Sequence, residues 1–189
     1  PAELAELTVV LLKCDVVAVD TESDSFFHYY EKVCLMQFAD GEGNSWLVDP
    51  LAVRDMSALA PLMSSPGVEK LFHGGENDIG LLKRDFKFEF ARVYDTQAAA
   101  RFCGRQELGL QTLLDKEFGI RLSKVHQRTD WSRRPLDPGQ VAYAAEDVRH
   151  LRKLRDRLQE DLVRRGREAW AREEGEALGA MGPAAVREP

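Results

Sequence analysis

The feature that most restricts the fold of this chain is a short apolar segment, residues 15–20, that ends in an acid. The segment is continuous and β-branched, which is typical of a buried strand. Two further strand-like segments follow at residues 33–38 and 45–48, with the turn-forming residues 41–44 between them. Three consecutive strands with short connections predict an antiparallel meander.

Helical patterns dominate the chain after this meander. Residues 57–63 have a helical pattern, residues 69–73 predict a further strand, and a Gly-Gly pair ends that strand before a helix that begins near Asn77. The spacing of apolar residues then predicts helices at about 96–103, 110–118 and 168–177. Strands early and helices later predict an α/β fold in which a mixed β-sheet is flanked by helices.

A start signal for a long helix occurs after a loop at residues 119–137. Asp137 supplies a carboxylate at the N-cap position, Pro138 stands at the first helical position and Gln140 at the third. We expect this helix to continue to about residue 164. We assign residues 1–165 to one domain and residues 166–189 to a C-terminal helical extension with a flexible tail.

The bulk properties exclude several classes of protein. A length of 189 residues allows one domain with a substantial core, and no apolar run approaches the roughly 20 residues that span a bilayer. No signal-peptide pattern opens the chain. Cys14, Cys34 and Cys103 are odd in number and form no CxxC pair, which argues against a disulfide framework and fits a reducing compartment. We therefore predict a cytoplasmic protein.

The net charge of −6 is unusual for a protein that binds nucleic acid, but the charges are unevenly distributed. The segment 121–134 contains a single acid, Asp130, among five basic residues. We predict that Arg133 and Arg134 contact phosphates and that Trp131 packs the loop against the sheet. The alternative is a solvated basic surface. The five basic residues are Arg121, Lys124, Arg128, Arg133 and Arg134.

Four acids and a tyrosine occur where their side chains can converge. Asp20 and Glu22 end the first strand, and positions i and i+2 of a strand face the same side. Asp78 lies in the first turn of a helix. Tyr143 and Asp147 are four residues apart in the long helix and share a face. Each also has a plain structural interpretation: a turn cap, a favourable charge at a helix N-terminus, or an exposed helix pair.

The combination of these groups indicates a metal-dependent phosphoryl hydrolase. Two-metal hydrolysis needs several carboxylates around two cations about 3.5–4 Å apart. Mg²⁺ or Mn²⁺ suits such all-oxygen ligation, and a phenol can hold the attacking water. The four histidines show no HExxH or HxxxH spacing, which argues against a zinc hydrolase. We therefore predict two Mg²⁺ or Mn²⁺ ions as cofactors.

Three motifs in this order resemble those of the DEDD exonucleases of the tyrosine subtype. The block at residues 130–136, its continuation through residues 140–147, and the segment 34–37 are similar to ribonuclease D in particular. Residues 70–78 are also similar to the exonuclease subunit of the nuclear exosome. The resemblance covers about residues 15–160. The motifs are Asp20-Thr21-Glu22, Phe72-His73-Gly74-Gly75-Glu76-Asn77-Asp78 and Tyr143-Ala144-Ala145-Glu146-Asp147.

The resemblance implies a ribonuclease H-like fold, with a mixed sheet of about five strands, and a role for each motif. The four acids of the motifs would bind the two metals, and Tyr143 would orient the attacking water. Thr21, His73 and Asn77 would contact the terminal nucleotide. The implied activity is hydrolysis of single-stranded RNA from the 3′ end, with release of nucleoside 5′-monophosphates.

Three alternatives stay open at the level of sequence. The substrate is DNA or a very short oligonucleotide, or the chain is a non-catalytic RNA-binding module. Ribonuclease D has helical nucleic-acid-binding domains after its exonuclease domain, and we expect none in this chain, so substrate length is open. An aromatic run at residues 26–30 either stacks on bases or packs locally. The sequence predicts no oligomeric state.

Overall fold

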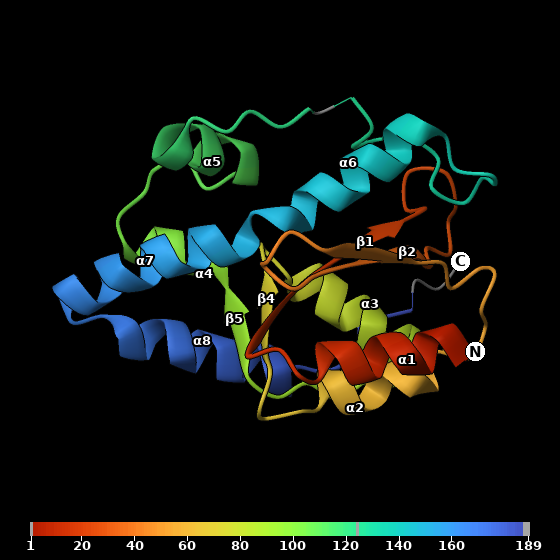
Figure 1. Cartoon of the computed structure of the whole chain (residues 1–189), viewed down its shortest axis with the longest axis horizontal. Helices are drawn as coiled ribbons and strands as arrows, with labels where there is room; N and C mark the ends of the chain where they lie inside the picture. Colours follow the sequence, from red (N-terminus) through yellow and green to blue (C-terminus); the bar gives the residue numbers. More distant parts are fainter. Residues whose placement is uncertain (1, 124, 187–189) are drawn as a thin grey trace.

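A mixed five-stranded sheet forms the centre of the protein. The computed structural model describes residues 2–123 and 125–186. The strand order is β3-β2-β1-β4-β5 (Figure 1). β1, β2 and β3 form an antiparallel meander, and β4 and β5 run parallel to β1. The predicted mixed sheet and meander are therefore confirmed. The strands are β1 (Val16–Ser23), β2 (Val33–Ala39), β3 (Ser45–Val48), β4 (Glu69–Phe72) and β5 (Val93–Asp95).

Helices cover both faces of this sheet (Figure 1). One core lies between the sheet and α1, α2 and α3, and a second lies between the sheet and α4, α5 and α7. Among the described residues, no helix has the length and apolar character needed to cross a membrane. The helices are α1 (Ala2–Leu11), the 3₁₀ helix η1 (Ser57–Leu59), α2 (Ala60–Met63), α3 (Glu76–Phe86), α4 (Thr96–Phe102), α5 (Leu110–Phe118), α6 (Pro138–Arg149), α7 (Leu151–Arg165) and α8 (Glu168–Ala180).

Strand β1 is the buried strand that its sequence predicts. Its neighbours are antiparallel β2 and parallel β4, so hydrogen bonds satisfy both of its edges. Val17 and Val19 point into the core under α1 and α3, whereas Val16 and Ala18 point into the core under α7. The strict alternation of side chains therefore puts the even-numbered positions of β1 on the α6–α7 face.

The prediction of one unbroken helix from residue 138 to 164 is wrong. Its start is confirmed, because Asp137 and Gln140 form a reciprocal capping box. At His150, however, the backbone has φ −102° and ψ −1°, so α6 ends and α7 begins. The break lets the two halves follow different parts of the twisted sheet: α6 crosses β1, β2 and β3, and α7 packs on β1, β4 and α4.

Two elements were not expected from the sequence. Helix α1 contributes Leu4 and Leu11 to the core, and the apolar run that ends it is interrupted by Lys13 before β1 begins. Strand β5 has only three residues, too few to give an alternating pattern. Both elements owe their place to packing against the sheet rather than to a local signal.

The C-terminal region folds back onto the sheet. Helix α8 lies against β5 so closely that a Cβ at Gly175 would be 1.9 Å from the Val93 carbonyl oxygen. Beyond α8, the Ala184 N–H donates a hydrogen bond of 2.9 Å to the Gly80 carbonyl of α3. The expected tail is thus attached at least as far as Ala184, and residues 187–189 lie outside the described part of the chain.

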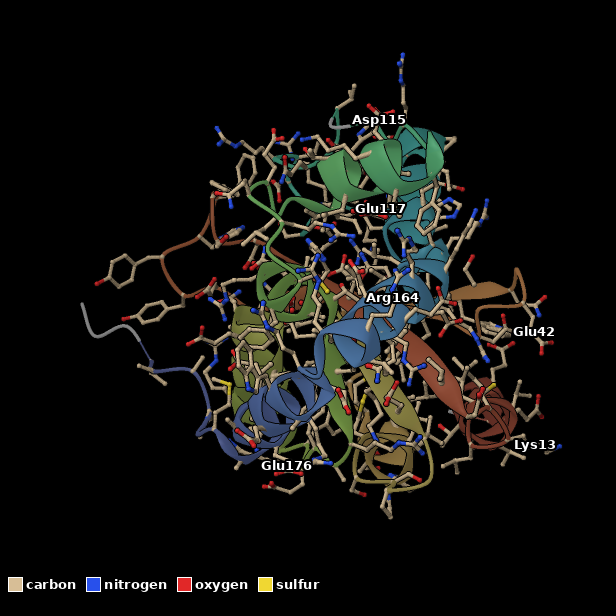
Figure 2. All side chains as sticks on the ribbon, turned by 90° about the vertical axis from the view of Figure 1, so that its left-hand side faces the viewer. Lys13, Glu42, Asp115, Glu117, Arg164 and Glu176 are labelled. Atoms are coloured by element: carbon tan, nitrogen blue, oxygen red, sulfur yellow. The ribbon has the colours of Figure 1, made fainter. Side chains whose placement is uncertain are left out.

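The outer surface of α7 and α8 carries side chains of both charges, as Figure 2 shows around Arg164 and Glu176. Several basic residues of α7 belong to this solvated face. Many of them also pair with acids of other elements, which ties the helix to the sheet. The pairs are Arg152 with Asp15, Arg155 with Glu69, and Arg157 with Glu117.

Candidate active site

Three of the predicted acids meet at the end of β1. Asp20 and Glu22 project from the same face of the strand, and Asp147 projects from α6 above them. One carboxylate oxygen from each lies within 4.8 Å of the other two. Two strand residues and one helix residue, separated by 125 positions in sequence, therefore form one acidic cluster.

The fourth acid, Asp78, joins the same pocket from the other side of β1. It lies in the first turn of α3, and the Thr21 hydroxyl donates a hydrogen bond to its Oδ1. The turn before α3 is fixed by Asp95, which accepts hydrogen bonds from the backbone N–H groups of Gly74 and Gly75, at 3.1 and 2.7 Å. A buried carboxylate at the end of β5 thus determines where Asp78 stands.

The electrostatics of the cluster are unfavourable without a cation. Burial, and then the charges of Asp78, Glu22 and Asp147, raise the pKa of Asp20 well above its usual value. Burial, together with the charges of Asp147 and Asp78, raises the pKa of Glu22 to about 9. Burial likewise raises the pKa of both Asp78 and Asp147 to about 6. These shifts describe acids that repel one another in a site shielded from water.

The donor set fits hard divalent cations. All four groups offer oxygen, which Mg²⁺ and Mn²⁺ prefer, and no sulfur or imidazole belongs to the described cluster. A divalent cation would remove the repulsion that raises these pKa values, because it favours the ionised form of each acid. The residues present are therefore suited to a bound metal.

Tyr143 stands one helical turn before Asp147 and lines the same pocket. Its ring packs at 38° against Trp131, with 6.1 Å between ring centroids. Trp131 is itself buried, with 1% exposure, so it packs the loop against the sheet as predicted and gives the tyrosine a rigid support. Burial and the nearby charges of Asp147 and Glu22 raise the pKa of the Tyr143 phenol, which keeps its proton at neutral pH.

A pocket of about 400 Å³ opens over the cluster. Of the predicted substrate residues, Thr21 and His73 line it. The ring nitrogens of His73 lie 2.8 Å from the Thr96 hydroxyl and 2.8 Å from the Leu108 carbonyl oxygen, so His73 anchors the segment that leads into α5. This histidine therefore shapes the wall of the pocket.

Much of the pocket wall was not predicted. Gln97 comes from α4, residues 109–112 from the start of α5, and Gln127 from the basic loop. None of these belongs to a recognised motif. The signals that do exist are weak: Gly109 before an apolar helix, and a polar first turn at Gln111 and Thr112.

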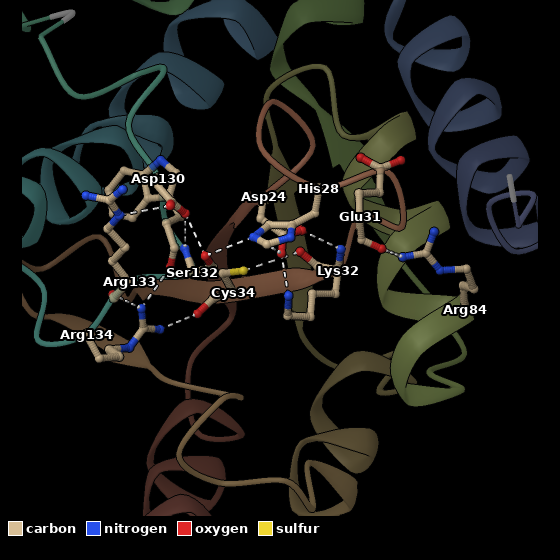
Figure 3. A network of polar contacts seen from close by, with 11 residues as sticks. Asp24, His28, Glu31, Lys32, Cys34, Arg84, Asp130, Ser132, Arg133 and Arg134 are labelled. Carbon is tan, nitrogen blue, oxygen red and sulfur yellow. Dashed lines mark hydrogen bonds and ion pairs between the residues drawn. The ribbon is translucent and has the colours of Figure 1, made fainter. Parts of the chain in front are cut away.

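Three predicted substrate residues lie elsewhere. Asn77 is exposed in the first turn of α3 and does not line the pocket among the residues described. Arg133 is exposed and pairs with Asp130 at 3.1 Å (Figure 3). Its phosphate contact stays a prediction, and Lys124 of the same basic segment lies outside the described residues.

Arg134 makes its contacts within the protein in this structure, and its predicted phosphate contact stays a prediction. Its guanidinium makes a bidentate pair with Asp49, at 2.6 and 2.9 Å, and donates to the carbonyl oxygen of Trp131. It also donates to the carbonyl oxygen of Cys34 (Figure 3). These contacts use the donors that a phosphate would need. Arg134 therefore fastens the 131–134 segment to β2 and to the residue after β3.

The aromatic run at residues 26–30 forms the loop that follows the end of β1. Buried Asp24 holds it by accepting hydrogen bonds from the backbone and ammonium groups of Lys32 (Figure 3). His28 lies 3.3 Å from the Ser132 hydroxyl, which links the run to the basic loop. The Arg128 guanidinium lies over the Phe26 ring at 5.7 Å. The four exposed rings are Phe26, Phe27, Tyr29 and Tyr30.

The sequence matches a family model described as 3′-5′ exonuclease over residues 1–163. Curated relatives include Protein RRP6-like 3 of Arabidopsis thaliana, 36% identical over 162 residues, and a ribonuclease D of Nitrobacter hamburgensis, 38% identical over 179 residues. These alignments cover 85% and 94% of this chain, but 18% and 47% of the relatives. The chain thus spans less than half the length of these relatives.

Solved structures share the same fold. The catalytic core of RRP6 from Trypanosoma brucei has a TM-score of 0.91 at 30% identity, over 96% of this chain and 50% of that one. Escherichia coli RNase D, an exoribonuclease involved in structured RNA processing, has a TM-score of 0.89 at 32% identity, over 98% and 49%. Brucella melitensis NrnC, solved with pGG and with Mg²⁺, has TM-scores of 0.82 and 0.81 at 26% identity, over 89% of this chain and 83–84% of that one.

Proposed function

The chain belongs to the 3′-5′ exonuclease family, and from this premise we propose that it removes nucleotides one at a time from the 3′ end of single-stranded RNA. The products are nucleoside 5′-monophosphates and an RNA shortened by one nucleotide with a free 3′ hydroxyl. The observation that carries the proposal is the acidic cluster at the end of β1, inside a pocket that Tyr143 also lines.

The proposed roles follow from the donor atoms. Asp20, Glu22, Asp78 and Asp147 would hold two Mg²⁺ or Mn²⁺ ions, and such ions acidify water and neutralise charge on a scissile phosphate when bound. The mutual repulsion of the acids supports this assignment, because it is relieved only by protonation or by a cation. The Mg²⁺ bound by the similar NrnC is in line with it.

Tyr143 acts as a hydrogen-bonding group and not as a base. Its raised pKa keeps the phenol protonated at neutral pH, so it cannot accept the proton of the attacking water. The phenol oxygen can hold that water in line with the P–O3′ bond, with Trp131 supporting the ring. The water gives up a proton to solvent as its oxygen bonds to phosphorus, the P–O3′ bond breaks, and the O3′ of the preceding nucleotide takes up a proton from solvent.

RNA is favoured as substrate by the similarity to ribonuclease D and RRP6. The exposed rings at residues 26–30 offer stacking surfaces for unpaired bases. A second candidate is an oligonucleotide of two to four residues. The similarity to NrnC, solved with the dinucleotide pGG and matched over most of its length, supports this alternative.

The experiment is a cleavage assay on 5′-labelled RNA and DNA of graded length, from 2 to 20 nucleotides, with Mg²⁺, Mn²⁺ or EDTA. The proposal predicts a metal-dependent ladder that shortens from the 3′ end on RNA, and its absence for Asp20→Asn. If only the shortest oligonucleotides are consumed, the second candidate holds instead. If purified wild-type protein releases no 3′ nucleotide with either metal, the proposed function is wrong.

A further inference from the structure

Gln37 of β2 is a buried polar residue that the proposed chemistry does not yet use. Its side chain is fully buried, with 0% exposure. Neither its Nε2 nor its Oε1 has a hydrogen-bond partner within residues 2–123 and 125–186. Buried amides are almost always hydrogen-bonded in native proteins, so a glutamine with both ends unpaired indicates a partner that is gained in another state of the site.

The strand register puts Gln37 beside the acidic cluster. In the antiparallel pair of β1 and β2, the residue directly opposite Gln37 is Asp20. Side chains of directly opposed residues lie on the same face of the sheet, with Cβ atoms about 4.5–5.5 Å apart. Helix α6 covers this face of β1 and β2, so Gln37 lies under the helix that carries Asp147.

The chemistry of the neighbours decides how the amide is oriented. A carboxylate accepts hydrogen bonds only, so the end of Gln37 that faces an ionised Asp20 must be the Nε2 donor. The Oε1 end then needs a donor. The Trp131 Nε1 is buried without a partner in the described structure, and its ring packs with Leu35 and Leu47, which flank Gln37 on the same face.

We propose that Gln37 is a positioning residue, whose Nε2 donates a hydrogen bond to the Asp20 carboxylate and holds it in the orientation that binds a cation, while Oε1 accepts from Trp131 Nε1. The terminal torsion of glutamine is soft, so the amide plane can turn about it to present Nε2 to the carboxylate. Gln37 does not line the pocket and touches no substrate. The inference rests on the proposed function, because it assumes that Asp20 is a metal ligand.

The test is Gln37→Met, which keeps the shape of the side chain and removes its donors. Mn²⁺ binding measured by calorimetry should weaken about 10- to 100-fold, the usual effect of losing a group that orients a metal ligand. The thermal midpoint of the metal-free protein should stay the same or rise, because an unpaired buried amide has been removed. Excess Mn²⁺ should restore cleavage of RNA.

Leu47→Met is the matched control, because Leu47 is the β3 neighbour of Gln37 and carries no polar group. It should leave Mn²⁺ affinity unchanged. Trp131→Phe removes the indole N–H together with part of the buried ring, so it should lower the thermal midpoint, but it should weaken Mn²⁺ binding by less than Gln37→Met. Since both variants break one chain of hydrogen bonds, the double variant should be no worse than Gln37→Met alone.

Two results would overturn the inference. One is a Gln37→Met protein that binds Mn²⁺ as tightly as wild type. The other is a loss of affinity matched by a fall in the metal-free thermal midpoint, which would make Gln37 a structural residue only. If the losses of Mn²⁺ affinity in the Gln37 and Trp131 variants add up in the double variant, the proposed hydrogen bond between these two residues is wrong. Failure of wild-type protein to bind Mn²⁺ at all would instead refute the proposed function.

Discussion

At the scale of single residues, the acidic cluster destabilises the metal-free fold, although the same carboxylates are the groups that suit a bound cation. The raised pKa values of its acids mean that ionising them costs free energy in the metal-free fold. Asp147→Asn removes one of these charges with little change in shape. We expect the metal-free variant to unfold at a higher temperature than wild type and to lose RNA cleavage. A lower thermal midpoint in EDTA would contradict this reading.

The same acids predict how stability depends on pH. A group whose pKa is raised by folding stabilises the fold below its unfolded value, near 4, and this contribution is lost as pH rises through the folded value. For Asp78 and Asp147 the loss runs from about pH 4 to about pH 6, and for Glu22 it continues to about pH 9. The thermal midpoint in EDTA should therefore fall between pH 5 and 9.

Two comparisons isolate this effect. Acids with lowered pKa values, such as Asp49 and Asp161, lose their contribution below about pH 4 and do not interfere in this window. Saturating Mn²⁺ should flatten the profile of the wild type, and Asp147→Asn should show a shallower fall in EDTA. If the thermal midpoint in EDTA does not change between pH 5 and 9, the acids of the cluster do not have the raised pKa values given above.

At the scale of elements, the turn between β4 and α3 controls one side of the site. A Cβ at Gly75 would lie 2.4 Å from the Phe72 Cβ, closer than any real contact. Gly75→Ala should therefore displace the start of α3, and with it Asp78. We expect weaker Mn²⁺ binding and at least a tenfold loss of RNA cleavage, while Gly67→Ala, where a Cβ would meet only the Ser65 hydroxyl at 3.5 Å, should do neither. Equal behaviour of the two variants would argue against this role.

The elements also show how far prediction from sequence reaches. Strands β1 to β3 were predictable because short, continuous apolar segments with turn residues between them specify a meander locally. The acids could be placed at a strand end, a helix start and a helix face for the same reason. The break at His150 was not, because it follows from the path of α6 and α7 over a twisted sheet.

Long-range partners account for the other differences. Arg134 stands in a basic segment and suggested a phosphate contact, but its partner Asp49 lies 85 positions away in sequence. The pocket wall formed by Gln97, Thr112 and Gln127 is assembled by the packing of two helices and a loop, each ordinary in isolation. Local sequence patterns carry no information about contacts between residues that lie far apart in the sequence.

At the scale of the whole molecule, the C-terminal helix α8 packs against the edge strand β5 of the sheet. Gly175 lets α8 approach β5, whose last residue, Asp95, holds the turn before Asp78. Gly175→Val should force the helix away from Val93 and lower the free energy of unfolding by about 1–3 kcal/mol. Urea unfolding would measure this change. Gly182→Val, where a Cβ meets nothing within 4 Å, is the control. If α8 is a dispensable extension, both variants will unfold like wild type.

A crystal of this protein soaked with Mn²⁺ and a nucleoside 5′-monophosphate tests the proposed two-metal site. The anomalous signal should show two manganese ions about 3.5–4 Å apart among Asp20, Glu22, Asp78 and Asp147. The phosphate should lie beside them, within reach of Tyr143. If the nucleotide binds without manganese at these four carboxylates, or if manganese binds elsewhere, the four carboxylates do not form the metal site.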